Sequence, residues 1–242
     1  MGSNFVYGDE VILKNVRAQW LDIYRPGDAM EEGREPKYKV IALIEPESQT
    51  LKDGKQAMLT VAKKLWPNNA IEVVKNMTAN SKAIRNGNAK INDEGDVRPE
   101  FKNMMFISAS NKVKPRIVGP ARVERGGKKV FVDINEDGTC SINGKVQDEA
   151  PYKITKPYRG CYVNLKVKFV AGKAFKGNDG KMIPNQVFCQ LIAVQFVKDG
   201  IAFGPGENSA DGFEDEDVEA VDTSGDDDDP MGDSVGDDDI PF

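Results

Sequence analysis

The chain has 242 residues, of which 39% are hydrophobic, and it carries 33 Lys+Arg against 39 Asp+Glu for a net charge of −6. It contains no histidine, which excludes Ser-His-Asp and Cys-His catalysis and histidine-ligated zinc. The three cysteines, Cys140, Cys161 and Cys189, are widely spaced and odd in number, so we expect buried thiols in a reducing compartment. No apolar run approaches the roughly 20 residues that span a bilayer, and no secretory signal is readable. We therefore expect a cytoplasmic protein without membrane contact.

Alternation of apolar and polar residues with a period of two, which is typical of strands, dominates the chain. It predicts strands at residues 11–24, 38–45, 103–110, 116–118, 128–134, 140–142, 160–170 and 186–197. Residues 55–66 instead have apolar residues at helical spacing, and Pro67 ends the predicted helix. A second short helix is expected at 71–77, whereas the Asn- and Lys-rich segment 80–98 is expected to be irregular.

The charge is divided unevenly along the chain. Residues 207–242 hold 16 of the acidic residues and no Lys or Arg, which leaves 33 basic and 23 acidic residues, a net charge of +10, in residues 1–206. A body of this sign favours polyanionic partners such as nucleic acid. A block of like charge repels itself, stays disordered and often serves as an interaction segment. The sequence therefore predicts a domain over 1–206 and a disordered acidic tail over 207–242.

Many short strands interrupted by one helical segment indicate a small barrel. The predicted fold is mainly β, an OB-fold-like antiparallel barrel with a helical insertion and a disordered acidic C-terminal tail. OB-fold barrels are partly open and leave one face and its loops for an oligonucleotide. We expect no domain boundary inside residues 1–206.

The tail closes with a tip that is both charged and apolar. It consists of Asp237, Asp238, Asp239, Ile240, Pro241 and Phe242. A tail that only adds solubility, which is the alternative interpretation, has no use for exposed Ile240 and Phe242. A basic pocket could bind the terminal ring and the α-carboxylate. The tip therefore predicts a protein-interaction site.

This Asp-Asp-Asp-Ile-Pro-Phe tip resembles that of bacterial single-stranded DNA-binding proteins. The body is similar to phage-encoded single-stranded DNA-binding proteins built on one OB-fold, on the order of three segments: 38–40, 166–169 with the Lys/Phe loop that follows, and 203–206. The resemblance implies a protein that coats single-stranded DNA. It also implies that the tail competes with DNA for the binding groove and recruits replication and repair proteins. Because the phage family uses aromatic residues in the corresponding loop, Phe175 is expected to stack on bases.

The segment 162–170 is the clearest candidate for contact with a single strand. Its alternation places Val163, Leu165, Val167 and Phe169 in the core and Tyr162, Asn164, Lys166 and Lys168 on the outside. Bases stack on rings while cations contact phosphates; a solvated outer face is the alternative. Aromatic and basic residues elsewhere complete the predicted DNA-binding set: Phe175, Lys173, Lys176, Lys129, Phe131, Phe106, Lys112, Lys114, Arg116, Tyr158, Arg159, Tyr24 and Arg25. Trp20 fits either the core or a contact surface.

Two short motifs favour turns over ligand sites. Asp133, Asn135, Asp137 and Gly138 match the first part of a calcium loop, but Gly144 stands where the bidentate Glu is required. Around residues 126–129 the flanking Gly and Ser/Thr of a phosphate loop are missing. We therefore predict a tight turn at 136–138, a hairpin turn at 126–127, and no metal or other cofactor.

The leading hypothesis is a non-catalytic, sequence-independent single-stranded DNA-binding protein that acts in replication, recombination and repair, in the host cytoplasm if phage-encoded. One alternative is a metal-dependent nuclease, although the predicted strands contain few carboxylates. Another is a protein adaptor whose acidic tail mimics nucleic acid. The sequence leaves open the preference between DNA and RNA, strand annealing, and whether the protein is a homo-oligomer.

Overall fold

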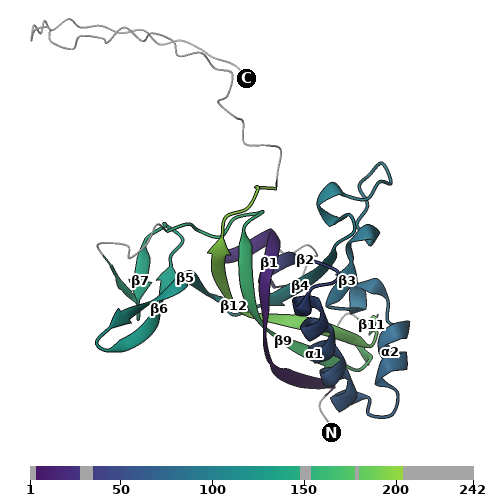
Figure 1. Ribbon diagram of the computed structural model, residues 1–242. Helices are drawn as coiled ribbons and strands as arrows, with labels where there is room; N and C mark the ends of the chain where they lie inside the picture. The colour runs from purple at the N-terminus through teal and green to yellow at the C-terminus, as the bar shows by residue number, and fades with distance from the viewer. Residues whose placement is uncertain (1–3, 28–34, 148–153, 178–179, 204–242) are drawn as a thin grey trace, which may run out of the picture. The chain divides into compact units, whose positions relative to one another are not determined.

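The computed structural model describes residues 4–27, 35–147, 154–177 and 180–203 (Figure 1). The chain separates into two units, Met1–Gly206 and Glu207–Phe242, and every element below belongs to the first. The strands are β1 (Phe5–Gly27), β2 (Lys37–Ile44), β3 (Ile84–Asn86), β4 (Met105–Asn111), β5 (Arg116–Arg125), β6 (Lys128–Ile134), β7 (Cys140–Ile142), β8 (Lys145–Val146), β9 (Tyr162–Gly172), β10 (Phe175–Lys176), β11 (Met182–Ile183) and β12 (Gln186–Lys198). The helices are α1 (Gln49–Leu65), α2 (Ala70–Asn76) and the 3₁₀ turns η1 (Ala79–Ser81), η2 (Gly87–Ala89) and η3 (Pro99–Phe101).

Five of the strands close into a ring in the order β4-β2-β1-β9-β12 and back to β4. Four contacts of the ring are antiparallel, whereas β12 and β4 run parallel, with Cys189 beside Ala109. The predicted OB-fold-like barrel is confirmed, except that this one contact is parallel and not antiparallel. A ring with an odd number of strands cannot close through antiparallel contacts alone. The domain is mainly β and its five-stranded barrel is OB-fold-like.

The interior of the barrel follows the alternation seen in the sequence. On β9, the side chains of Val163, Leu165, Val167 and Phe169 are completely buried. Their neighbours Tyr162, Asn164, Lys166 and Lys168 are partly exposed. The predicted inner and outer faces of this strand are therefore confirmed. Full burial of each such apolar side chain stabilises the fold by about 1.5–3 kcal/mol.

Helix α1 packs against the barrel and begins six residues earlier than predicted. Ser48 precedes it, and the Ser48 Oγ accepts a hydrogen bond from the Leu51 N–H at 3.2 Å. A Cβ on Gly54 would lie 3.3 Å from Leu13 Cδ2 of β1, so glycine permits the close approach although it weakens the helical pattern. The helix ends at Leu65, before Pro67, as predicted. Within the described ranges, no helix is both long and apolar enough to cross a membrane.

The segment after α2 is more ordered than its composition suggested. We expected residues 80–98 to be irregular, but they contain β3, which pairs with the edge of β4 so that Arg85 lies beside Phe106. The turns η1 and η2 come directly before and after β3 in the chain. Sequence patterns missed the strand because three residues are too few for a detectable alternation.

Strands β5 to β8 extend the sheet beyond the barrel (Figure 1). The start of β5 runs parallel to β12, and the rest of β5 continues outward with β6. This arm has its own small hydrophobic cluster around Val132, Cys140 and Ile142. The sequence predicted the bounds of β6 and β7. It did not predict that they lie outside the barrel, because alternation indicates which side of a strand is buried and not which strands pair with it.

Both predicted turns are confirmed. Gly126 and Gly127 have φ angles of +56° and +71° and connect β5 to β6, the conformation that a tight hairpin requires. Between β6 and β7, Asp137 Oδ1 accepts hydrogen bonds from the backbone N–H and the hydroxyl of Thr139, at 2.9 and 2.7 Å. Gly138 follows with a φ of +86°.

The three cysteines are free and buried, as predicted. Burial raises the pKa of the Cys161 thiol to about 11 and raises the pKa of the Cys189 thiol as well. The thiolate is the reactive form of cysteine. All three side chains are therefore shielded from solvent, and the raised pKa values of Cys161 and Cys189 also disfavour their thiolates.

We predict that the native protein reacts slowly with a thiol reagent such as DTNB at pH 8, and that all three thiols react after unfolding in guanidinium. The reason is burial and, for Cys161 and Cys189, a raised thiol pKa. Absorbance of the released chromophore measures both rates, with the unfolded chain as the control for three equivalents. Rapid titration of a thiol in the native state would contradict this packing.

Candidate nucleic-acid interface

On the outer surface of the barrel, side chains of β2 lie directly opposite side chains of β4. We call this surface the β2–β4 face; it consists of Lys39, Ile41, Leu43, Phe106, Ser108 and Ser110. The side chains that alternate with them on the two strands are completely buried: Val40, Ala42, Ile107 and Ala109. The face is therefore the solvent side of a wall whose other side is barrel core. In OB-folds, this pair of strands and the flanking loops form the surface that oligonucleotides contact.

Trp20 extends this face onto β1. It lies beside Ile41 in the register of β1 and β2, and 42% of its surface is exposed. Its indole N–H donates to Asp22 Oδ2 at 2.7 Å, and the Arg159 guanidinium carbon lies 5.3 Å from the ring centroid. The sequence left Trp20 between core and contact surface; the structure exposes it. An exposed ring beside a cation suits base stacking.

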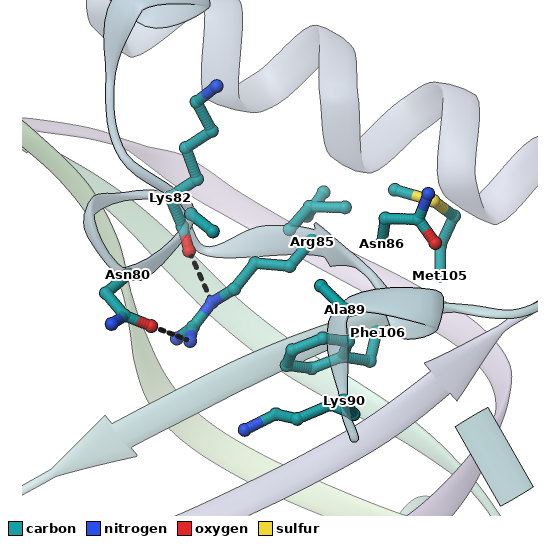
Figure 2. A pocket seen from close by; sticks show the side chains of 10 residues that line it. Asn80, Lys82, Arg85, Asn86, Ala89, Lys90, Met105 and Phe106 are labelled. Carbon is teal, nitrogen blue, oxygen red and sulfur yellow. Dashed lines mark hydrogen bonds between the residues drawn. The ribbon is translucent and has the colours of Figure 1, made fainter. Parts of the chain in front are cut away.

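A cluster of cations borders the β2–β4 face at β3 (Figure 2). The Arg85 guanidinium carbon and the Lys90 Nζ lie 5.3 and 5.5 Å from the centroid of the Phe106 ring. Burial lowers the pKa of Arg85. Burial also lowers the pKa of Lys90, with further contributions from the positive charges of Arg85, Lys39 and Arg98. Among the ion pairs of the described ranges, none involves Arg85, Lys90 or Lys39.

Phe106, predicted as a DNA contact, does not offer a free ring. It is only 2% exposed and packs edge-on against Phe101 with centroids 5.3 Å apart. The sequence predicted an extended segment that includes Phe106, but the pattern could not show that β3 and η3 cover this ring. The Arg85 and Lys90 side chains lie close to this ring, and this placement does not support stacking on a base.

The predicted residues of β9 lie on another outer surface, between β1 and β12. Lys166 forms an ion pair with Glu10 of β1, and the hydrogen bond from Lys166 is the main reason that the pKa of Glu10 is lowered. The Tyr162 ring lies 4.7 Å from Lys198 Nζ, while Lys168 is partly exposed. This surface thus brings three predicted residues together, but an acidic residue offsets one of its cations.

The loop after β9 forms a small hairpin, β10–β11, in which Phe175 lies beside Ile183. The Phe175 ring packs edge-on against Phe5 at 5.5 Å, so it is half-buried in an aromatic cluster. Its neighbours Lys173 and Lys176 are exposed. The structure therefore places both lysines where a phosphate can reach them and leaves only part of the ring accessible.

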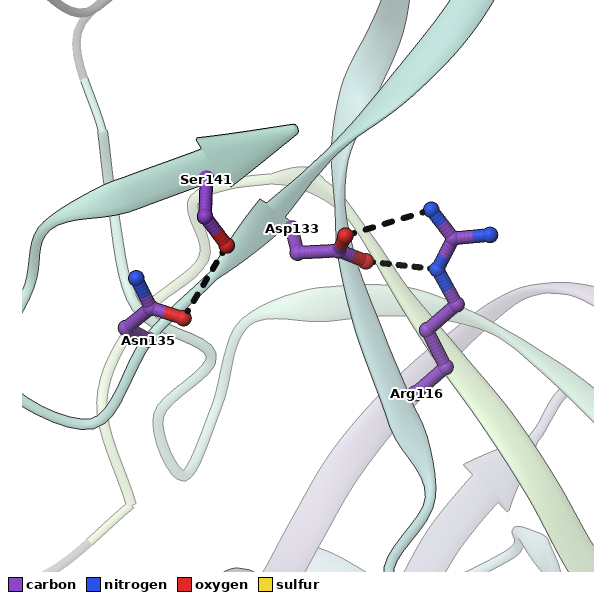
Figure 3. Close-up of polar contacts among 4 residues, drawn as sticks. All are labelled: Arg116, Asp133, Asn135 and Ser141. Carbon is purple, nitrogen blue, oxygen red and sulfur yellow. Dashed lines mark hydrogen bonds and ion pairs between the residues drawn. The ribbon is translucent and has the colours of Figure 1, made fainter. Parts of the chain in front are cut away.

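Several predicted cations have acidic partners within the barrel and arm. Arg116 donates to both carboxylate oxygens of Asp133, at 2.5 and 3.2 Å (Figure 3). Arg25 pairs with Glu136 at 2.5 Å, and Lys112 pairs with Glu35. Asp133, the first residue of the calcium-like motif, is thus engaged by an arginine. Across the described ranges, no group of three or more acidic or thiol side chains is placed to hold a metal ion.

The remaining predicted residues are spread over the domain. Lys129 and Phe131 lie on β6 of the arm, where the Arg122 guanidinium carbon lies 4.6 Å from the Phe131 ring. Lys114 is exposed before β5. The Tyr24 hydroxyl is buried without a hydrogen-bond partner in the described structure, and burial raises its pKa. The tip residues 237–242 lie outside the described residues.

The segment after β12 is anchored at the edge of the β2–β4 face. Tyr158 Oη accepts a hydrogen bond from the Gly200 N–H at 3.0 Å, and the Phe203 N–H donates to the Arg159 carbonyl at 3.0 Å. The Phe203 ring lies 4.0 Å from the Arg17 guanidinium carbon and packs against the cluster that contains Leu43 and Phe106. Residue 203 is therefore held against the face shortly before the acidic segment that starts at 207.

Sequence reasoning missed Lys39, Ile41, Arg85 and Lys90 as site residues. Lys39 and Ile41 had a signal, since they alternate with the apolar core positions of β2. Arg85 and Lys90 belong to a basic, Asn-rich segment whose composition was visible but whose partner strand was not. Only the pairing of β3 with β4 brings their charges to Phe106.

An OB-fold-like barrel whose outer sheet carries an exposed ring and cations without an acidic partner among the described residues has the general form of a nucleic-acid-binding protein. Residues 9–223 match the family described as Enterobacter phage Enc34, ssDNA-binding protein, and the chain belongs to this family. It is 28% identical over 212 residues to protein p50 of Acyrthosiphon pisum secondary endosymbiont phage 1, covering 85% of this chain and 93% of that protein. Its fold is similar to the single-stranded DNA-binding protein of bacteriophage Enc34 in complex with ssDNA, with a TM-score of 0.51, 18% identity, and coverage of 81% of this chain and 89% of the other.

Proposed function

We propose that the protein is a sequence-independent single-stranded DNA-binding protein that coats DNA during phage replication, recombination and repair in the host cytoplasm. The observation that carries the proposal is the cluster of Lys39, Arg85 and Lys90, which has no acidic partner in the described ranges and borders the OB-fold face. Family membership and the DNA-bound relative support it. The proposed chemistry is binding without catalysis.

The β2–β4 face supplies the two kinds of contact that a single strand needs. Trp20 offers a partly exposed ring for base stacking, and the cations at β3 offer positive charge for phosphates. The hydroxyls of Ser108 and Ser110 lie between them on β4. Stacking on a ring and contact with phosphates use features that all nucleotides share, so little sequence preference is expected.

The acidic tail is proposed to compete with DNA for this face and, through its tip, to recruit replication and repair proteins. Residues 207–242 carry 16 acidic and no basic residues, which makes the tail an electrostatic substitute for a short polyanion. The packing of Phe203 against the cluster of Leu43 and Phe106 supports competition, because the last described residue before the acidic segment lies at the β2–β4 face. Recruitment rests on the apolar and charged residues of the tip.

Binding of poly-dT is expected to quench the fluorescence of Trp20, the exposed one of two tryptophans, while Trp66 is 9% exposed in the core. Trp20→Ala should weaken binding by about 1–3 kcal/mol, and Trp20→Phe, which keeps a ring, should retain most of the affinity and lose the quench. Fluorescence titration and anisotropy with poly-dT and duplex DNA measure these effects. Equal binding of duplex and single strand would contradict the proposal.

Removal of residues 207–242 should tighten binding of a dT oligonucleotide at low salt, because it removes an internal polyanion. The gain should shrink towards physiological salt, where charges more than about 8 Å apart are screened. Titrations of the full chain and of residues 1–206 at two salt concentrations measure both effects. Equal affinities at low salt would rule out competition by the tail, and failure of residues 1–206 to bind any oligonucleotide would favour the adaptor hypothesis.

Phe242→Ala should abolish recruitment of host replication or repair proteins while leaving the affinity for dT close to that of the unchanged protein. The tip ring is the proposed anchor in the partner's pocket, and the substitution leaves every charge of the tail in place. Pull-down from host extract followed by mass spectrometry measures recruitment, with Ser234→Ala as a control substitution in the same tail. Equal capture by both variants would contradict recruitment through the tip.

A further inference from the structure

A pocket of about 400 Å³ opens at the edge of β4 between η1, β3 and η2. The polar and aromatic side chains that matter for its chemistry are Asn80, Lys82, Arg85, Asn86, Lys90 and Phe106. Figure 2 shows the Phe106 ring with the Arg85 and Lys90 head groups on either side of it. The pocket lies outside the five-stranded ring, in the insertion between β2 and β4.

The Arg85 side chain is held in place by the protein and keeps donors free. Its Nε donates to the Lys82 carbonyl at 2.9 Å, and its Nη1 donates to Asn80 Oδ1 at 3.3 Å. A guanidinium has five N–H donors, so these two bonds leave capacity for another acceptor. The Lys90 ammonium makes no hydrogen bond or ion pair in the described part of the chain.

Two half-buried cations without an acidic partner are an unfavourable arrangement unless an anion joins them. The charges of Lys39 and Arg98 add to the repulsion at Lys90. An anion in the pocket would relieve this repulsion and replace the water that burial has removed. Guanidinium and ammonium groups are the usual partners of phosphate.

The pocket is also larger than a phosphate and mostly apolar, which fits a ligand with a base attached. Ile84, Met105 and the Phe106 ring line the apolar part, while the amides of Asn80 and Asn86 offer both donors and acceptors. The pocket adjoins the β2–β4 face, since Phe106 lines the pocket and lies beside Leu43 in the register of that face. A strand bound on the face is therefore next to the pocket.

We infer that this pocket binds one nucleotide of the single strand, with its phosphodiester held by Arg85 and Lys90. The inference rests on the proposed function and adds a defined subsite to it, contributed by the segment between β2 and β4. The site discriminates against no particular base, because the fixed contact is to the phosphate. It anchors the strand at the β3 edge of the face.

The test is the double variant Arg85→Gln/Lys90→Gln, compared with Lys52→Gln/Lys55→Gln, which removes the same charge from exposed positions of α1. Anisotropy titrations with dT15 are recorded at several salt concentrations for both, in the full chain and in residues 1–206. The pocket variant should bind at least about tenfold more weakly at low salt, and its dependence of log K on log salt should be less steep by about 0.7 for each lost phosphate contact. The α1 variant should stay within about twofold of the unchanged protein.

These titrations distinguish failure of the proposed function from failure of the pocket assignment. If the unchanged protein fails to bind dT15, the proposed function fails; if it binds and the two double variants are equally affected, only the pocket assignment fails. An acidic peptide such as the tail is the other occupant with suitable charge. In that case the pocket variant would bind dT15 more tightly than the unchanged protein in the full chain, because the tail is released, and with unchanged affinity in residues 1–206; this pattern would overturn the assignment to a nucleotide.

A second measurement needs no substitution and so is independent of folding defects. Acylation of the unchanged protein with an amine-reactive ester, read out by peptide mass spectrometry, reports the accessibility of each lysine. Saturation with dT15 should lower the labelling of Lys90 several-fold and leave Lys52 and Lys55 unchanged. Equal labelling of Lys90 with and without DNA would overturn the inference.

A substitution that keeps the charge, Arg85→Lys, should retain most of the salt dependence of dT15 binding.

Discussion

The parallel contact between β4 and β12 determines what the barrel presents to solvent. On one edge, β4 pairs with β2 along its whole length. On the other edge, residues 109–110 pair with β12 and residues 105–107 pair with β3. Because ring closure uses only part of this edge, the remainder accepts a short strand that the barrel itself does not need. That strand carries Arg85 to Phe106, so the cation cluster follows from the way in which an odd-numbered ring closes.

Charge pairing divides the surface of the domain into two kinds of region. Near the arm and the β1–β2 connection, arginine and lysine are matched by acids, as in the pairs Arg116–Asp133 and Lys112–Glu35. At the β3 edge the cations face an aromatic ring and one another. Surface ion pairs contribute little to stability, but they do neutralise potential locally. Within the described part of the chain, the cations at the β3 edge therefore keep a positive potential that no neighbouring carboxylate neutralises.

Much of the fold could be predicted from the sequence, but less of the site. Alternation correctly identified the buried side of β9 and the bounds of β6 and β7, because a period of two reports directly which side chains leave solvent. It could not report what covers the outer side, and Phe106 was misjudged for that reason. Arg85 and Lys90 were missed because their role depends on a three-residue strand and on its partner, which no local pattern encodes.

Net charge alone overstates how much of this domain can bind a polyanion. Residues 1–206 carry +10 overall, yet four of the predicted contacts, Arg25, Lys112, Arg116 and Lys166, are paired with acids of the same domain. A paired cation that turns to a phosphate leaves its carboxylate without a partner, so the net gain is small. Lys39, Arg85 and Lys90, by contrast, form no ion pair with an acid of the described residues. Phe203, which packs against the cluster that contains Leu43 and Phe106, lies beside Arg17 at the edge of this region.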